Sequence, residues 1–541
     1  MRRLRRGAPP PATHRRLLIV QIDGLSRSRF EQALTSKRMP FVRRLIESGR
    51  YHLEPMSVGL PTSTPAFQMA AFYGVRPDIP GFHYYNRERR GDIHFPRSGH
   101  AAWVEGKHSA DRRGILQGGS AYGCCFTGGA ENNFFTFASL TKPSGRGILS
   151  ALSPYFVVAW VAGKNLALTL YEIARAVPRF VAHPRRRARR GWRWLWLKVG
   201  MGIWIRNFFT MAVSRDLYAG VPVIYVNYLD YDEAAHAYGP NSRRVAQALR
   251  GVDRAIRQLW RVMRRVPEHD YDAYILADHG QAPCTPYREL SRGRRLERWI
   301  FDEFLHPVGA DVPQNPNHGL TRGIHTRRKG TAGMFQRFMN YIDEDYFRQR
   351  DPQAYEQDGV RVIAAGPNAF LYALDTAAPL DIEAIDRKFP ELPEKLSRSL
   401  GIGYVLARST NGPVCFWQGE RHVLRASEPG PFAGREDSAT VVQGIVDLMA
   451  MPSAGDLVIY GTDAPKGHVS YIPEHGAHAG TSPDEMHTFI VRPARAVLPL
   501  PISHPVQLYK HFMRYQNGWP RSAGIRHASA RAGKNGQGTC A

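Results

Sequence analysis

LLIVQIDG, residues 17–24, is an unbroken apolar run that ends in Asp-Gly. Such a run is typical of a strand that is buried on both faces of a parallel sheet and then enters a loop. The runs VPVIYVNYLDYD (221–232) and YDAYILADHG (271–280) repeat this pattern. Between them, apolar residues recur three and four apart from Val245 to Met263, which predicts an amphipathic helix. Strand, helix and strand in this order, with long connections, predict an α/β fold with a parallel sheet.

Each of the three predicted strands ends in acidic residues. Asp23 ends the first run, Asp230 and Asp232 end the second, and Asp278 ends the third. In open α/β sheets, ligands bind at the carboxyl ends of the strands. We therefore expect these acidic ends to meet at one edge of the sheet and to form the functional site.

Several short segments carry residues that suit a divalent cation at this edge. Asp and neutral His remain deprotonated near neutral pH and bind hard or borderline cations. Asp232 and His236 are four residues apart, so a helix would place both on one face. His279 directly follows Asp278, and SYIPEHGAHAGTSPDEMHTFIV near the C-terminus contributes three more histidines: His475, His478 and His487. Each piece alone is more often a solvated surface group, but their repeated location at strand ends favours a metal site.

The segment GLPTSTPAFQMAAFYG (59–74) contains the candidate nucleophile. Pro65 suits the first position of a helix over AFQMAAFY, so Thr64 is predicted to be the N-cap residue. A helix N-terminus offers free N–H groups and the positive end of the helix dipole to a phosphate. A threonine hydroxyl becomes a nucleophile when its pKa falls, and coordination to a divalent cation lowers it. Without a metal nearby, Thr64 would be an ordinary helix cap.

The charge balance points to an anionic partner. The 541 residues include 73 Lys and Arg against 47 Asp and Glu, a formal net charge of +26. This excess attracts phosphorylated substrates, nucleic acid or an anionic membrane surface, although arginine spread along the whole chain accounts for part of it. The five cysteines have no metal-type spacing, which favours a reducing compartment and predicts a cytoplasmic protein.

The chain is expected to form one large catalytic domain over residues 17–515. Residues 1–16 are predicted to be a disordered basic arm, because they lack the apolar stretch of a signal peptide. A helical insertion is expected at about 105–215 and a small α/β cap at about 285–440. The polar residues 516–541 are predicted to be a disordered tail. No segment offers the roughly 18 uncharged apolar residues of a clear membrane span.

Residues 154–209 combine apolar, aromatic and basic side chains. Arginines at 185–187 and 189–190 lie close to four tryptophans: Trp192, Trp194, Trp196 and Trp204. Tryptophan flanked by arginine suits a helix that lies on an anionic bilayer, which would make the protein peripheral at the inner membrane surface. A helical hairpin packed on the core, with its arginines in water, is the alternative. Nucleic-acid binding is a third interpretation and the least favoured.

These motifs, in this order, resemble the alkaline phosphatase superfamily, specifically its type I phosphodiesterase/nucleotide pyrophosphatase branch. The resemblance runs from Leu17 to about Met513 and is carried by VQIDG, LPTSTPAF, YLDYDEAAHAYGP, LADHG and GAHAG. YLDYDEAAHAYGP is the most specific of these segments. The resemblance implies an alkaline-phosphatase-like α/β core, with a mostly parallel central sheet flanked by helices. It also implies two divalent ions about 4 Å apart, zinc first and manganese second.

The resemblance also implies how the ligands divide between the two ions. One ion would be held by Asp23, Thr64, Asp278 and His279, and the other by Asp232, His236 and His478. His475 is the rival for the last place, and the small residues of Gly-Ala-His-Ala-Gly favour His478. Asn86 resembles the asparagine that contacts the phosphoryl oxygen, although it lies one residue further from Gly81 than is usual.

The expected function is hydrolysis of a phosphodiester or pyrophosphate through a phospho-threonine intermediate on Thr64. A phosphomonoesterase or phosphonate hydrolase would use the same ions with a different pocket. A membrane-associated headgroup phosphotransferase would use the same threonine, but such enzymes usually have clear spanning helices. A non-catalytic binding protein is the least favoured alternative, because all seven core positions are present. The substrate itself is read by loops and the cap, which these motifs do not specify.

Overall fold

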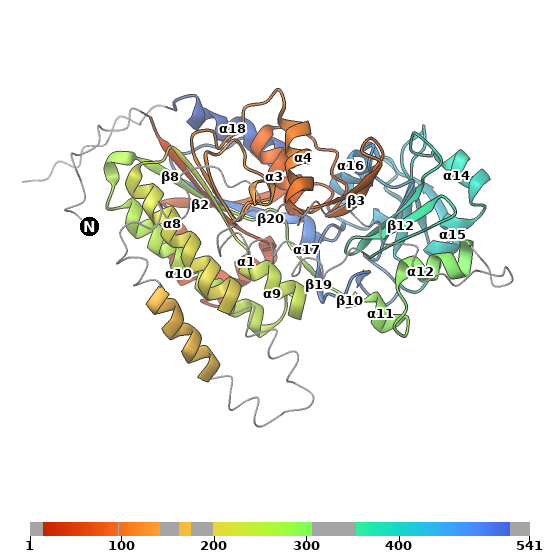
Figure 1. The fold of residues 1–541 in the computed structure, drawn as a ribbon, viewed down its shortest axis with the longest axis horizontal. Helices are drawn as coiled ribbons and strands as arrows, with labels where there is room; N and C mark the ends of the chain where they lie inside the picture. Colours follow the sequence, from red (N-terminus) through yellow and green to blue (C-terminus); the bar gives the residue numbers. More distant parts are fainter. Residues whose placement is uncertain (1–13, 96, 141–161, 175–198, 306–352, 520–541) are drawn as a thin grey trace, which may run out of the picture.

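The computed structural model describes residues 14–95, 97–140, 162–174, 199–305 and 353–519. They form two seven-stranded sheets, each with helices packed against it, and three two-stranded sheets (Figure 1). The α/β fold predicted from the strand and helix patterns is therefore confirmed.

The central sheet has the strand order β2-β20-β8-β1-β7-β5-β6. Strand β1 lies in its middle and pairs in parallel with both β7 and β8, as the three apolar runs predict. Only β20 runs antiparallel to its neighbours, so the sheet is mixed but mostly parallel. The strands are β1 (Arg16–Ile22), β2 (Tyr51–Ser57), β5 (Ser120–Tyr122), β6 (Asn132–Phe134), β7 (Val223–Tyr228), β8 (Tyr271–Leu276) and β20 (His487–Pro493).

Alternate side chains of β1 enter two different cores, one on each face of the sheet. Leu17 and Ile19 pack in the core that also contains α3 (Thr64–Tyr73), α4 (Ser98–Ser109) and α18 (Val506–Gln516). Leu18 and Val20 pack on the opposite face. The helices of that face are α1 (Arg27–Thr35), α2 (Pro40–Glu47), α8 (Arg206–Ala219), α9 (Asp230–Tyr238) and α10 (Arg243–Met263). The helix predicted from Val245 to Met263 is α10.

The second sheet is antiparallel and has the order β11-β12-β13-β17-β14-β15-β16. One of its faces shares the core of α3 and also packs against α16 (Ser438–Met449), which joins the two sheets into one body. The other face is covered by α11 (Tyr287–Leu290), α12 (Leu296–Ile300), α14 (Ile382–Lys388) and α15 (Leu392–Ser397). The strands are β11 (Gln353–Gln357), β12 (Val360–Ala364), β13 (Asn368–Ala373), β14 (Tyr404–Ala407), β15 (Val414–Trp417), β16 (Glu420–Val423) and β17 (Leu457–Tyr460).

The domain boundaries expected from the sequence differ from this architecture in three places. The cap expected at about 285–440 stops short of β17, which lies in the middle of the second sheet. The insertion expected at about 105–215 includes β5 and β6, two strands of the central sheet. Arg16, placed in the basic arm, begins β1. Strand partners are set by pairing between distant segments, which local patterns do not reveal. The arm before residue 14 and the tail after residue 519 lie outside the described residues.

Replacing His511 by Gln is expected to make folding less sensitive to acid. Burial lowers the pKa of His511 from its ordinary 6.5 to about 3. As the pH falls below 6.5, the unfolded chain binds a proton at this histidine that the folded chain does not bind. The contribution of His511 to the free energy of unfolding is therefore complete above pH 6.5 and is lost as the pH falls toward 3. In His511→Gln, the free energy of unfolding should fall less steeply with acid, by up to about 1.4 kcal/mol per pH unit.

Urea unfolding between roughly pH 5 and 7 measures this slope. The amide of Gln can replace the imidazole Nε2, which lies 2.7 Å from the Tyr274 hydroxyl. The matched control is His52→Gln, at an exposed position, which should leave the slope unchanged. Identical slopes for the wild type and His511→Gln would show that His511 does not contribute to acid sensitivity.

Candidate functional site

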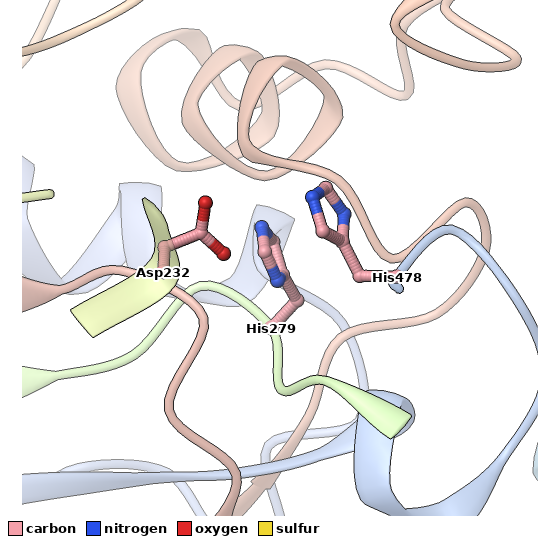
Figure 2. A group of neighbouring side chains, drawn as sticks. All are labelled: Asp232, His279 and His478. Atoms are coloured by element: carbon pink, nitrogen blue, oxygen red, sulfur yellow. The ribbon is translucent and has the colours of Figure 1, made fainter. Parts of the chain in front are cut away.

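The carboxyl ends of β1, β7 and β8 bring the predicted acidic residues together. Asp23 follows β1, Asp232 lies in the first turn of α9 just after β7, and Asp278 and His279 follow β8. Because β1 pairs with both neighbours in register, all three ends lie at the same edge of the sheet. His478 reaches this edge from the loop after β19 (Gly476–Ala477). Figure 2 shows Asp232, His279 and His478 gathered around one space.

Thr64 lies within one group of these residues. Its hydroxyl donates to Asp23 Oδ1 at 3.3 Å, and Thr64 Oγ1 is 3.1 Å from His279 Nε2. His279 Nε2 is in turn 3.4 Å from Asp278 Oδ2 and 3.6 Å from Asp23 Oδ1. Asp23, Asp278 and His279 each offer one ligand atom, and these three atoms lie within 4.8 Å of one another.

Asp232 is the centre of a second, adjoining group. His236 Nε2 lies 3.2 Å from Asp232 Oδ2, so the helix predicted over this pair does place both side chains on one face. Asp232, His279 and His478 also offer ligand atoms within 4.8 Å of one another. The ring of His478 stacks on that of His279 at 3.8 Å and lies 5.0 Å from that of His236.

All three histidines are oriented by a backbone carbonyl. A carbonyl oxygen can only accept, so it holds the proton on Nδ1 and leaves a lone pair on Nε2. The Nδ1 contacts are His236 to Gly476 O at 2.9 Å, His279 to Gly280 O at 3.1 Å and His478 to Thr62 O at 2.9 Å. In the neutral form of each ring, the backbone carbonyl thus leaves Nε2 as the atom that can bind a cation.

The electrostatics of the site are dominated by buried carboxylates. Burial and the charges of Asp278 and Asp232 raise the pKa of Asp23 well above its ordinary value. Burial also raises the pKa of Asp278 to about 6, and the charge of Asp232 acts in the same direction. Although burial opposes it, the charge of His236 holds the pKa of Asp232 well below its ordinary value.

Burial keeps two of the histidines neutral. It lowers the pKa of His279 to about 4 and that of His478 to about 3. His236 behaves differently, because the charges of Asp232 and Glu474 overcome the effect of burial and raise its pKa well above the ordinary value. Neutral imidazole is the form that binds a metal.

The N-terminus of α3 differs by one residue from the sequence prediction. Ser63 is the N-cap and Thr64 is already the first helical residue, so Pro65 occupies the second position. Ser63 has extended backbone angles, and its carbonyl accepts from Phe67 N at 3.0 Å. Proline is tolerated throughout the first turn because its missing N–H has no partner there. Thr64 is 6% exposed, so it is a buried residue of the site.

Asn86 and His475 are not directed into either group. Asn86, in β3 (His83–Asn86), donates from Nδ2 to Ser453 Oγ at 2.9 Å and accepts from Arg89 N at 2.8 Å. Its amide therefore ties β3 to the second sheet domain instead of pointing at Thr64. His475 contributes its backbone, since its N–H donates to the carbonyl of His236 at 2.8 Å.

Several residues that the sequence analysis did not single out hold this site in place. Asn227 Nδ2 donates to Asp23 Oδ2 at 2.7 Å, and Gln281 donates from Nε2 to Asp232. Glu474 Oε2 lies 2.7 Å from His236 Nδ1. Asn227 is a polar residue inside a buried apolar strand, which is a signal that the sequence did carry. Gln281 and Glu474 carry no such signal, because only the fold brings them beside Asp232 and His236.

The donor set suits divalent cations. Asp278 Oδ2 is buried and accepts no hydrogen bond from the described residues, which is costly for a carboxylate oxygen unless a cation satisfies it. Carboxylate oxygens and imidazole nitrogens are the ligands that zinc and similar ions prefer. The two groups share His279 and adjoin each other.

A known protein family matches a large part of the chain. The family model described as type I phosphodiesterase / nucleotide pyrophosphatase matches residues 17–367. This match includes Asp23, Thr64, Asp232 and His279, and it ends before His478. No curated protein matches the chain.

Two similar solved structures are both of phosphonoacetate hydrolase from Sinorhizobium meliloti 1021. The complex with phosphonoformate has a TM-score of 0.48 and 13% identity, and it covers 94% of this chain and 96% of that chain. The complex with phosphonoacetate has a TM-score of 0.46 and 12% identity with the same coverage.

Gly24→Ala should disable the site while leaving most of the fold intact. Gly24 has φ of +70°, and an added Cβ would lie 2.3 Å from Asp232 Oδ1. The new methyl group must displace the Asp232 carboxylate, and a shift of this kind is expected to lower phosphodiesterase activity by about 100-fold. Hydrolysis of bis-p-nitrophenyl phosphate measures the loss.

Gly49→Ala is the matched control for the backbone. Gly49 has φ of +69°, but nothing lies within 4 Å of the added Cβ. Both variants carry the strain of a left-handed alanine, about 1 kcal/mol of unfolding free energy, and only Gly24→Ala meets Asp232. Equal activity in the two variants would show that the close approach of Gly24 to Asp232 is not needed.

Proposed function

We propose that Thr64 is the nucleophile of this chain, which belongs to the type I phosphodiesterase/nucleotide pyrophosphatase family of the alkaline phosphatase superfamily. Members of this family are metal-dependent hydrolases of phosphoester bonds, and this chain is an enzyme of that class. The observation that supports Thr64 is its position. Its hydroxyl is at the N-terminus of α3, 3.3 Å from Asp23 Oδ1 and 3.1 Å from His279 Nε2.

Two divalent cations would complete the site, with zinc the first candidate and manganese the second. Asp23, Thr64, Asp278 and His279 would hold one ion, and Asp232, His236 and His478 the other. When bound, the ions lower the pKa of the threonine hydroxyl and neutralise charge on the phosphoryl and leaving oxygens. His478 is preferred to His475, because its ring stacks on His279 and because, among the described residues, His475 is in neither group of candidate ligands.

The residues of the chain then position and move the reacting groups. Thr64 Oγ attacks phosphorus as its proton passes to Asp23 Oδ1. The bond from phosphorus to the leaving oxygen breaks, and that oxygen departs with the bonding electron pair and takes up a proton from water. The amides of the first turn of α3 and the Ser63 hydroxyl stabilise the phosphoryl oxygens. Ser63 Oγ suits this role because it is buried and has no partner among the described residues. Water then cleaves phospho-Thr64 and restores the hydroxyl.

The proposed substrate is a phosphodiester or pyrophosphate. This is the substrate class in the description of the family that the chain matches. The net charge of +26 favours an anionic substrate of this kind. Phosphomonoesters and phosphonates would place the same phosphoryl group beside Thr64, so they serve as comparison substrates in the test.

Thr64→Ala should reduce hydrolysis of bis-p-nitrophenyl phosphate by roughly a thousand-fold or more, because the attacking oxygen is lost. Thr64→Ser keeps the oxygen and should retain a measurable fraction of the activity. In the wild type, rapid acid quenching followed by mass spectrometry should find phosphate on Thr64. Chelation should abolish activity, and zinc should restore it better than manganese.

The comparison substrates are p-nitrophenyl phosphate and phosphonoacetate, and the diester should be hydrolysed fastest. Asp278→Asn, which keeps the shape of the side chain and removes its charge, should also inactivate the enzyme. Survival of diesterase activity in both Thr64→Ala and Asp278→Asn would refute the proposed nucleophile and its cation.

We also infer that the chain docks on an anionic membrane surface. Of residues 154–209, only 162–174 and 199–209 are described, and the arginine cluster at 185–190 lies outside them. Residues 162–174 form a helix in which Asn165 is buried and Thr169 is half-buried, whereas Lys164 is exposed. Asn165 accepts from Asn207 at 2.7 Å, and Thr169 accepts from Trp204 Nε1 at 3.1 Å.

The apolar residues of this helix face outward. Leu166 is 53% exposed and Leu170 is 57% exposed, and Leu168 and Ile173 are exposed as well. This is the reverse of the usual amphipathic arrangement and indicates an apolar partner. Because the chain has a net positive charge, we infer that this apolar partner is an anionic bilayer. Within the described ranges, no helix has the length and apolar character needed to cross a membrane.

Flotation with vesicles of phosphatidylcholine alone, or mixed with phosphatidylglycerol, tests this inference at low salt. The wild type should float with the anionic vesicles, and Leu166→Gln/Leu170→Gln should bind roughly tenfold more weakly, because less apolar area enters the bilayer. Leu400→Gln/Val497→Gln is the control, since both residues are exposed but lie elsewhere. No flotation of the wild type would exclude membrane docking.

A further inference from the structure

We infer that Glu474 is a positioning residue for His236 and, through it, for the cation that Asp232, His236 and His478 would share. The inference rests on the proposed function, because it assigns a role toward a proposed ion. It adds a residue that lies outside the proposed ligand set and touches neither the ion nor the substrate.

Contacts on both carboxylate oxygens hold Glu474 in place. Oε2 lies 2.7 Å from His236 Nδ1, and Oε1 accepts from Ser470 Oγ at 2.6 Å. Glu474 is 7% exposed and Ser470 is fully buried, so water competes little for either contact. The carboxylate therefore keeps one orientation and directs one oxygen at the imidazole.

The backbone around Glu474 also grips the helix that carries His236. Glu474 lies between β18 (Val469–Ser470) and β19, and β19 pairs with β9 (Ala282–Pro283) beyond β8. The next residue, His475, donates its N–H to the carbonyl of His236 at 2.8 Å. Glu474 thus belongs to a segment that is hydrogen-bonded to the end of α9.

Glu474 acts on His236 through its negative charge more than through a hydrogen bond. Gly476 O lies 2.9 Å from the same Nδ1, so a carbonyl alone can hold the proton there and keep Nε2 free. A carboxylate on the far side of a ligating imidazole makes that imidazole a stronger donor to the metal. Among the residues that the structure describes, the Nδ1 partners of His279 and His478 are carbonyl groups, whereas His236 also has a carboxylate beside its Nδ1.

Two variants separate charge from geometry. Glu474→Gln keeps an acceptor oxygen of the same reach without the charge, and Glu474→Ala removes both. In competition with a chromophoric chelator, Glu474→Ala should lose about 10- to 100-fold in affinity for one of two zinc ions, with Glu474→Gln in between. With cobalt in place of zinc, the visible bands of that ion should shift in both variants.

Glu105→Gln is the control for loss of a buried carboxylate. Glu105 is also 7% exposed and accepts hydrogen bonds from Tyr73 and Thr127, but it contacts none of the proposed ligands. This variant should lower the melting temperature of the chelated protein and leave both zinc affinities unchanged. Glu474→Ala should instead lower the affinity for zinc, and it should change the melting temperature of the chelated protein less than Glu105→Gln does.

The outcomes distinguish the role of Glu474 from the proposed function. Zinc affinities of both Glu474 variants within twofold of the wild type would overturn the positioning role while the wild type still binds two ions. A metal-free melting temperature that falls with no change in affinity would make Glu474 purely structural and would also overturn it. If the wild type itself binds no zinc, the proposed two-ion site fails, and with it this inference.

Discussion

The repulsion between two buried carboxylates, Asp23 and Asp278, and the half-buried Asp232 is the constraint on which the rest of the site depends. Taking an ionised carboxylate out of water costs several kcal/mol unless opposite charge or hydrogen bonds compensate it. Asp23 is 3% exposed and Asp278 is fully buried, so solvent gives little help. The fold nevertheless places all three at adjoining positions of one sheet edge. Such an arrangement is stable only if some of the carboxylates take up protons or if a cation enters the same space.

The chain supplies part of that compensation itself. His236 pairs with Asp232, and Asn227 donates to Asp23. Asp278 Oδ2 is left without a hydrogen bond from the described residues. The remaining deficit is what two divalent cations would remove, and it explains why the histidines around the site are held by their Nδ1 atoms with Nε2 facing inward. The carboxylate of Glu474 behind His236 would strengthen that imidazole as a donor without entering the ligand shell.

The geometry of the site is set mainly by the ends of strands and helices, and His478 comes from a loop. Asp23 and Asp278 directly follow adjacent strands, and Asp232 lies in the first turn of a helix. Thr64 belongs to the first turn of α3, whose residues are all buried. The approach is close enough that Gly24 leaves no room for a side chain beside Asp232. Preorganisation of this kind is what phosphoryl transfer requires, since catalysis consists mainly of positioning and charge stabilisation.

Local patterns were enough to identify β1, β7, β8 and α10, because an unbroken apolar run or a repeat of three and four is a property of a short segment. The same patterns predicted that Asp23, Asp232 and Asp278 would meet, since parallel strands end at one edge. Contacts between distant segments could not be read in this way. The tertiary structure alone placed β5, β6 and β17 in their sheets, turned the amide of Asn86 toward Ser453, and put His478 rather than His475 beside His279. It also brought Glu474 to His236 and Gln281 to Asp232. The physical reason is that a side chain's neighbours depend on the packing of the whole chain, whereas its strand or helix depends mostly on the residues next to it.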